Sequence, residues 1–338
     1  MSIAVPASPQ ERAEHIRQVV TAAGAALRQR HPWLQYQDAI GVAILLIGLA
    51  GMGLSAWAWL AGAVSAWITI PLTAFFAALT HELEHDLIHW MYFRKRPWAH
   101  HLMLALCWLA RPSTINPWVR RQLHFEHHKF SGTERDREER GITNGERWGI
   151  ARLLMLGDAG FSAWWRIRRV PEAKVRRQLW KRFFKVYFPL GSIHWLLWYL
   201  FLGAHLTLGV AALAGAPLAP PGWLGVLDAI VVVWIAPNVL RSFCLHFISS
   251  NMHYYGDIDT SDVVQQTQIL DAWWTWPFQL FCCNFGSTHA IHHFVVKEPF
   301  YIRQWTAGAA HRVMLAMGVR RNDVGTFHRA NRWSTGTP

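Results

Sequence analysis

The chain contains two long apolar segments, each long enough to cross a membrane twice. Residues 39–80 contain no Asp, Glu, Lys or Arg. A second segment, residues 186–240, is broken by the run GAPLAPPG, and Asp228 is the only charged residue before its end. A helix that crosses the hydrocarbon core of a bilayer needs about 20 apolar residues. The pattern therefore predicts an all-α integral membrane fold with four transmembrane helices in two hairpins, at residues 39–60, 64–88, 186–214 and 223–248.

The segments between and around these spans are polar, and one of them is strongly basic. Residues 129–185 contain 15 Lys and Arg but only 7 Asp and Glu. Because Lys and Arg concentrate in the cytoplasmic loops of membrane proteins, we expect this region and both termini on the cytoplasmic side. Within it, residues 168–185 (RRVPEAKVRRQLWKRFFK) are typical of an interfacial helix on anionic lipid, or could meet an acidic head group or carrier.

The two ends of the chain complete a single membrane domain over residues 1–338. Residues 1–38 have mixed charge without the pattern of a signal peptide, so we expect an amphipathic N-terminal segment that stays in the cytoplasm. Residues 294–338 form the predicted cytoplasmic tail.

The composition agrees with a membrane protein and argues against two other classes. The chain is 52% hydrophobic with 21 Trp and only 16% charged residues, which is too apolar for an average soluble domain. The net charge of +12 comes from basic residues lying between apolar blocks, without any nucleic-acid-binding motif, so no nucleic-acid partner is expected. The four cysteines lack C-x-x-C spacing, which excludes a zinc ribbon.

Eleven of the 19 histidines fall in four short stretches, which the predicted topology brings to the cytoplasmic side. Residues three or four apart share one face of a helix, so two imidazoles from one helix can reach the same metal ion. One zinc ion takes at most four protein ligands, so eight or more imidazoles suit a pair of metals. The clustered histidines are His81, His85, His89, His124, His127, His128, His246, His253, His289, His292 and His293.

The pattern H-x-x-H-H occurs twice, as HFEHH and HAIHH, and is preceded by HELEHDLIH. With these motifs the chain resembles the integral-membrane fatty acid desaturase and hydroxylase superfamily, which has three histidine boxes of the forms H-x(3,4)-H, H-x-x-H-H and H-x-x-H-H. The resemblance extends from about residue 39 to about residue 305, including a Pro-aromatic stretch after the last box. It implies two Fe²⁺ ions as cofactors, with O₂ as co-substrate.

The resemblance also implies a set of ligands. Boxes two and three correspond one for one to His124, His127, His128, His289, His292 and His293. In box one, His81 and His89 lie about 12 Å apart along a helix, so with His85 they can hardly all bind one ion. The pair His81 and His85 (HELEH) is more similar to the alkane hydroxylase branch, whereas His85 and His89 (HDLIH) give the family's usual distance to box two. We favour His85 with His89, and we expect His81 as a ligand or as a hydrogen-bonding neighbour of the ligands.

Several further residues are candidates for the same site. His253 follows the last span, where family members use another histidine, and His246 lies seven residues earlier. Asn251 or Asn284 could hold a bridging water. Four acids between the ligands either lie on a solvated helix face or accept hydrogen bonds from imidazoles, which fixes the imidazole tautomer. These acids are Glu82, Glu84, Asp86 and Glu126, of which Glu82, Asp86 and Glu126 are the candidates for the hydrogen-bonding role.

The resemblance implies an O₂-dependent oxidoreductase that acts on a C–H bond of a fatty acyl chain or other membrane lipid, with a desaturase as the first expectation. A hydroxylase, an alkane-type monooxygenase or a decarboxylase that forms a terminal alkene stays open, because the outcome depends on how the substrate carbons are placed. The chain has no haem, flavin or ferredoxin motif, so we expect a separate donor of the ferredoxin, rubredoxin or cytochrome type at the cytoplasmic face. The expected location is a bacterial inner membrane, with the active site cytoplasmic.

Two other classes of protein are weighed against this interpretation. HELEH matches H-E-x-x-H, the signature of zinc metalloproteases, but a protease would leave HFEHH and HAIHH unexplained. A metal carrier would place its ligands within the spans along a path, whereas these cluster on one side of the membrane. Metal content distinguishes the three classes: the oxidoreductase should contain two irons, the protease one zinc and the carrier an exchangeable metal.

Overall fold

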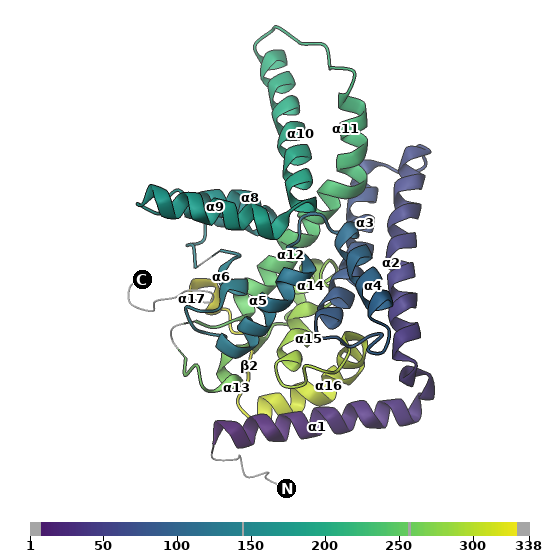
Figure 1. Cartoon of the computed structure of the whole chain (residues 1–338), viewed down its shortest axis with the longest axis vertical. Helices are drawn as coiled ribbons and strands as arrows, with labels where there is room; N and C mark the ends of the chain where they lie inside the picture. The colour runs from purple at the N-terminus through teal and green to yellow at the C-terminus, as the bar shows by residue number, and fades with distance from the viewer. Residues whose placement is uncertain (1–7, 144, 256–257, 330–338) are drawn as a thin grey trace.

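The computed structural model describes residues 8–143, 145–255 and 258–329, and Figure 1 shows the arrangement of their helices. Within these residues the fold is helical apart from a pair of two-residue parallel strands, β1 (Gln268–Ile269) and β2 (Arg320–Arg321). Residues 1–7 and 330–338 of the predicted terminal segments lie outside the described residues.

Four helices are long and apolar enough to cross a membrane, and two hairpins join them in pairs. The first pair is α2 (Gln37–Leu60) and α3 (Ala66–Ile88). The second is α10 (Leu190–Leu213) and a continuous helix made of α11 (Leu224–Ile230), a π-helical turn and α12 (Ala236–Met252). The predicted all-α membrane fold with four spans is confirmed, and the helix bounds differ from the predicted spans by a few residues.

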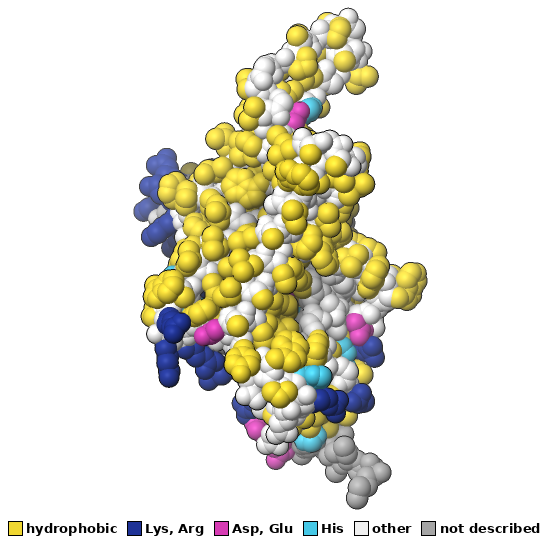
Figure 2. Space-filling view, turned by 90° about the vertical axis from the view of Figure 1, so that its right-hand side faces the viewer, with side chains coloured by type: hydrophobic (Ala, Val, Ile, Leu, Met, Phe, Trp, Pro, Cys, Tyr) yellow, Lys and Arg dark blue, Asp and Glu magenta, His cyan; other side chains and the backbone are white. Residues whose placement is uncertain are grey.

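The outer surfaces of these helices suit lipid rather than water. The most apolar 18-residue window of α10 has none of its residues buried inside the protein. Trp67 on α3 and Leu213 on α10 are 87% and 91% exposed. Figure 2 shows hydrophobic side chains covering the upper and middle part of one face, with Lys and Arg at its left edge and lower end. Such a continuous apolar surface is tolerated in a bilayer.

Below the spans, a cap of shorter helices packs around the end of α3. It contains α1 (Pro9–Arg30), α5 (Pro117–Phe130), α15 (Phe285–His292) and α16 (Phe300–Ala316), with α4 (Pro97–Ala110) alongside α3. The segment after the last histidine box is an integral part of this cap, because α16 packs on both α1 and α15. Buried apolar side chains from seven helices and strands form the main core of the cap, among them Ile16, Ile248, Ile269, Ile291 and Met314.

The basic region and the remaining connections form short helices. The basic region contains α6 (Arg137–Arg140), α7 (Ile150–Gly157), α8 (Ala159–Ile167) and α9 (Ala173–Tyr187). Helix α9 has no buried residue and lies across the base of α10 in Figure 1. The other helices are α13 (Val263–Gln266), α14 (Trp276–Gln279), α17 (Thr326–Arg329) and the 3-10 turns η1 (Pro32–Gln35) and η3 (Trp273–Thr275).

Helix α3 is the element that joins the membrane region to the cap. Its last eight residues, from His81 to Ile88, carry two His, two Glu and one Asp, and all eight are buried. Polar groups buried at this density need partners. The end of α3 is therefore where a functional site is expected.

Candidate metal centre

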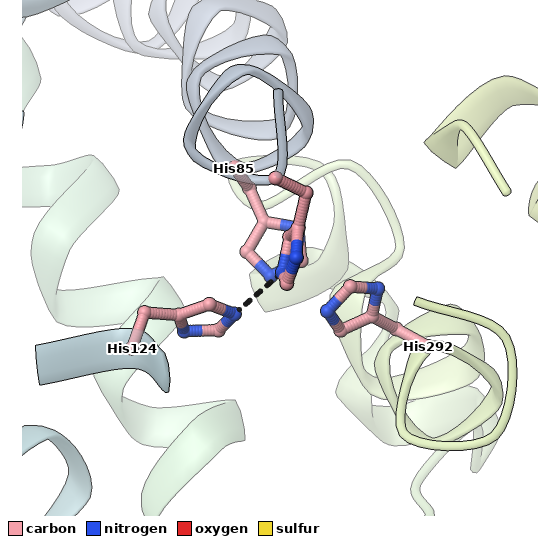
Figure 3. Close-up of side chains that lie close together, drawn as sticks. His85, His124 and His292 are labelled. Atoms are coloured by element: carbon pink, nitrogen blue, oxygen red, sulfur yellow. Dashed lines mark hydrogen bonds between the residues drawn. The ribbon is translucent and has the colours of Figure 1, made fainter. Parts of the chain in front are cut away.

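Eight histidines form two compact groups in the cap. In each group the four side chains offer one nitrogen apiece, and these nitrogens all lie within 4.8 Å of one another. Figure 3 shows His85 from α3, His124 from α5 and His292 from α15 pointing toward one another. The first group is His85, His89, His124 and His292, and the second is His127, His253, His289 and His293.

Two helices serve both groups. Helix α5 supplies His124 to the first group and His127 to the second. The last box, on α15 and its C-cap residue, likewise supplies His292 to the first and His289 with His293 to the second. Residues three apart on a helix are about 4.5 Å apart along its axis, so the two groups lie next to each other. The H-x-x-H-H motif thus lets one helix supply imidazoles to both neighbouring groups.

His128 lies against the first group without being one of its four members. Its Nε2 atom is 3.0 Å from Nε2 of His124 and 3.0 Å from Nε2 of His292. Its ring also lies 5.1 Å from the ring of His293 in the second group. His128 therefore occupies the boundary between the two groups.

Hydrogen bonds at Nδ1 orient three of the imidazoles. Nδ1 of His127 is 2.7 Å from Oδ2 of Asp136, and Nδ1 of His124 is 2.8 Å from Oε2 of Glu138. Nδ1 of His253 is 2.9 Å from the carbonyl oxygen of Ser249. An imidazole that donates its Nδ1–H presents the lone pair of Nε2, and a carboxylate partner makes that nitrogen a stronger ligand.

Sequence reasoning missed Asp136 and Glu138, which belong to the charged stretch ERDREER at residues 134–140, shortly after box two. That stretch was the available clue. Asp136 is fully buried and also accepts a hydrogen bond of 2.7 Å from the hydroxyl of Tyr255. The buried carboxylate is thus itself held in place.

The acids singled out in the sequence have other partners. Asp86 accepts hydrogen bonds from the hydroxyl of Tyr92 (3.1 Å), the N–H of Phe300 (2.9 Å) and the guanidinium of Arg303 (3.2 Å). Glu82 lies 3.7 Å from the same guanidinium. These contacts tie α3 to α16. Glu126 is half-buried, and no hydrogen bond in the described part of the chain joins it to a histidine.

The other predicted candidates lie outside the two groups or bond elsewhere. His81 is buried, and its Nδ1 atom is 3.3 Å from a guanidinium nitrogen of Arg111. His246 contacts the carbonyl oxygen of Leu156 at 2.8 Å. Asn251 donates to the carbonyl oxygen of Phe247 (2.7 Å), and Asn284 donates to Oε1 of Gln304 (3.1 Å).

The atoms at the centre of each group fit a metal ion. The Nε2 atoms of His85, His127 and His253 are buried and have no hydrogen-bond partner among the described residues. Buried polar atoms without partners are costly and therefore rare. In each group these atoms lie close to the nitrogens of other imidazoles. Neutral imidazole nitrogens do not repel a cation, so a bound metal ion could be the missing partner. Four imidazoles are a donor set that divalent iron, copper or zinc accepts.

The charge state of most of the imidazoles with a shifted pKa also suits metal binding. Burial lowers the pKa of His89 to about 3, and it holds the pKa values of His124, His289 and His292 well below the ordinary value. These rings are therefore neutral near pH 7, which is the form that binds metal. His127 differs: burial acts to lower its pKa, but the Asp136 carboxylate outweighs that effect and raises it to about 9.

Comparison with known proteins gives the family. The family model described as fatty acid desaturase matches residues 58–324, a range that contains all eight grouped histidines. No curated protein matches the chain. Because the model covers most of the chain and the structure brings the three histidine boxes together at the ends of four apolar helices, the chain belongs to the fatty acid desaturase family of di-iron oxidoreductases.

Proposed function

We propose that this protein is a fatty acid desaturase, a membrane enzyme that uses O₂ and external electrons to remove two hydrogens from a fatty acyl chain. The observation that supports this most is the pair of adjacent four-histidine groups, buried in the cap directly beneath the spans. A desaturase needs two metal ions within reach of one carbon pair, and this arrangement offers two sites side by side.

In this proposal His85, His89, His124 and His292 hold one Fe²⁺ ion, and His127, His253, His289 and His293 hold the other. His128, which lies against the first group, is a further candidate ligand for the first ion. When bound, the iron pair supplies the oxidising power for the C–H bond, with O₂ as co-substrate. Neutral imidazole ligands would leave the positive charge of each bound ion uncompensated by the ligands themselves.

The protein's own contribution is orientation and exclusion of water. Asp136 and Glu138 fix the Nδ1 hydrogens of His127 and His124, one imidazole in each group. Arg303 on α16 binds Asp86 on α3, so the helix that carries His85 cannot shift relative to the rest of the cap. Burial of the ligands keeps bulk water from the reacting carbon.

The fatty acid desaturase family implies a lipid substrate and an electron donor. We propose that the donor is a separate ferredoxin, rubredoxin or cytochrome that docks on the cytoplasmic face. The basic character of residues 129–185 supports this orientation and would attract an acidic donor. The same orientation places both termini and the metal centre in the cytoplasm.

The test is to feed perdeuterated fatty acids to cells that express the wild-type chain, His127→Ala or His15→Ala, and to analyse the lipids by mass spectrometry. His15 lies on α1, outside both groups, and serves as the matched control. The desaturase would be supported by a product that lacks two deuterium atoms, if it is present in wild-type and His15→Ala cells and absent from His127→Ala cells. Purified wild-type protein should contain two irons per chain.

Other products would redirect the assignment within the family. One deuterium replaced by a hydroxyl group would make the protein a hydroxylase, and an alkene one carbon shorter would make it a decarboxylase. A single zinc ion with no lipid product would contradict the oxygenase altogether. An active His292→Ala variant would contradict the ligand assignment.

A further inference from the structure

A cavity of about 230 Å³ lies beside the metal centre. Glu138 and Glu139 form part of its wall. Glu138 contacts His124 of the first group, and Oε2 of Glu139 lies 3.4 Å from Nδ1 of His253 in the second. The cavity is therefore separated from both groups by a single layer of side chains.

The most unusual residue in its lining is Arg241 on α12. Its side chain is 1% exposed, Nε donates to Oδ1 of Asn238 (3.2 Å), and Nη2 donates to Oγ of Ser242 (3.0 Å). Its Nη1 atom is buried without a hydrogen-bond partner, and no carboxylate pairs with it in the described part of the chain. A buried charge that lacks a counter-charge is strongly unfavourable.

The rest of the lining is also rich in hydrogen-bond donors. The lining contains four arginines but only two glutamates. Glu138 is engaged with Arg120 and His124, and Glu139 accepts a hydrogen bond from Ser249. Ser113 and Ser242 add hydroxyl groups 3.1 Å apart, and Nδ1 of His194 is buried without a partner in the described residues. This excess of positive charge and of donors suits an anion.

The position of Arg241 along its helix suits the head group of an amphiphile. Arg241 follows Leu224 by 17 residues, which is about 26 Å along a helix. Because the hydrocarbon core is about 30 Å thick, Arg241 lies near its boundary on the side of the metal centre. Phe183 and Tyr187 of α9 and Trp195 of α10 line the same cavity, so its wall is apolar toward the helices that face lipid.

We propose that this cavity binds the carboxylate of an unesterified fatty acid, with Arg241 as its counter-ion. The identification of that fatty acid as the substrate rests on the proposed function, but its binding does not. A buried guanidinium whose Nη1 atom has no partner, with hydroxyl groups beside it, matches a singly charged carboxylate. A neutral ester would leave the Arg241 charge uncompensated, so the enzyme would discriminate between the acid and its esters.

The experiment measures binding to the purified full-length chain in a neutral detergent, by calorimetric titration, without turnover. Hexadecanoate is compared with methyl hexadecanoate and with hexadecyl phosphate. The proposal expects the acid to bind at least tenfold more tightly than the methyl ester, and Arg241→Gln to remove this difference. Arg182→Gln, which removes one exposed positive charge from α9, is the matched control and should bind as wild type does.

A thermal unfolding scan of the same proteins keeps the proposal testable if Arg241→Gln is poorly folded. Removing an uncompensated buried charge should leave the ligand-free unfolding temperature equal or higher, with iron content unchanged. Arg241→Lys, which keeps the charge, should retain a preference for the acid. A large fall in unfolding temperature for both variants would mean that Arg241 is structural and would overturn the proposal.

The remaining outcomes separate this inference from the proposed function. Tighter binding of hexadecyl phosphate than of hexadecanoate, lost in Arg241→Gln, would assign the cavity to a phosphate head group and overturn the carboxylate. Equal affinity of wild type and Arg241→Gln for hexadecanoate would overturn the inference even if the enzyme oxidises acyl chains. Arg241-dependent binding without any oxidised product would support the inference and count against the desaturase.

Discussion

Helices α3 and α12 both carry buried charged residues near the metal centre, but these charges have different partners on the two helices. On α3, Glu84 pairs with Arg111 and Arg120, and Asp86 pairs with Arg303. On α12, the hydrogen bonds that Arg241 donates within the described part of the chain go to the neutral side chains of Asn238 and Ser242. The comparison suggests two roles for buried charge. A compensated charge holds helices together, whereas an uncompensated charge marks a place where a ligand completes the site.

The largest effect on stability is expected from an Arg→Gln substitution at Arg303, which pairs with the buried acids of α3. Arg303→Gln leaves Asp86 and Glu82 buried without their counter-charge, which should lower the free energy of unfolding by about 3–5 kcal/mol. Arg241→Gln should not lower it. Thermal unfolding of both variants in one detergent tests the contrast, and a similar loss for both would abolish the distinction between the compensated and the uncompensated charge.

An exposed pair provides the control for Arg303→Gln. Arg321 contacts Asp271 at 2.8 Å, but its side chain is 45% exposed. Arg321→Gln should lower the free energy of unfolding by no more than about 1 kcal/mol, because solvent screens such pairs.

A smaller effect is expected from a carboxylate that acts on a ligand. Asp136→Asn weakens the hydrogen bond that orients His127, so iron affinity at the second group should fall roughly 10–100-fold. Glu126→Gln, at an acid without a hydrogen bond to a histidine in the described residues, should leave iron affinity unchanged. Competition with a chelator measures both affinities. Equal losses would show that nearby charge matters rather than the hydrogen bond.

The smallest effect is expected at Tyr92. Tyr92→Phe removes one hydrogen bond to Asp86 but leaves Arg303 in place, so the free energy of unfolding should fall by roughly 0.5–1.5 kcal/mol. Denaturant titration at constant detergent concentration would measure it. A loss as large as that of Arg303→Gln would show that the hydroxyl, rather than the guanidinium, compensates Asp86.

The sequence alone predicts the four spans and the meeting of the histidine boxes, because apolar length and helical spacing are local properties. Among His81, His85 and His89, the preference for His85 with His89 rests on the family's box pattern, because local spacing alone leaves all three as candidates. The structure separates them because α3 ends at Ile88, and His89 turns into the first group while His81 faces Arg111. Arg303 lies 217 residues from Asp86, so their pairing depends on how α16 packs and leaves no trace in local spacing.

Arg241 illustrates the same limit from the other side. Its sequence position is ordinary for a basic residue near the end of a span. Only the packed structure shows that its neighbours are an amide, a hydroxyl and a cavity. A sequence pattern cannot predict that a buried charge lacks a counter-charge, because this depends on every element that surrounds the side chain.

The sharing of α5 and α15 between the two histidine groups has a consequence for assembly. If both ions bind as proposed, each of these helices is fixed at one turn by the first ion and at the neighbouring turn by the second. Binding of either ion therefore restricts the rotation and sliding that would otherwise misplace the ligands of the other. Binding of the two irons should therefore be cooperative. A preparation with less than two irons per chain should contain mainly molecules with no iron or with two, and few with one.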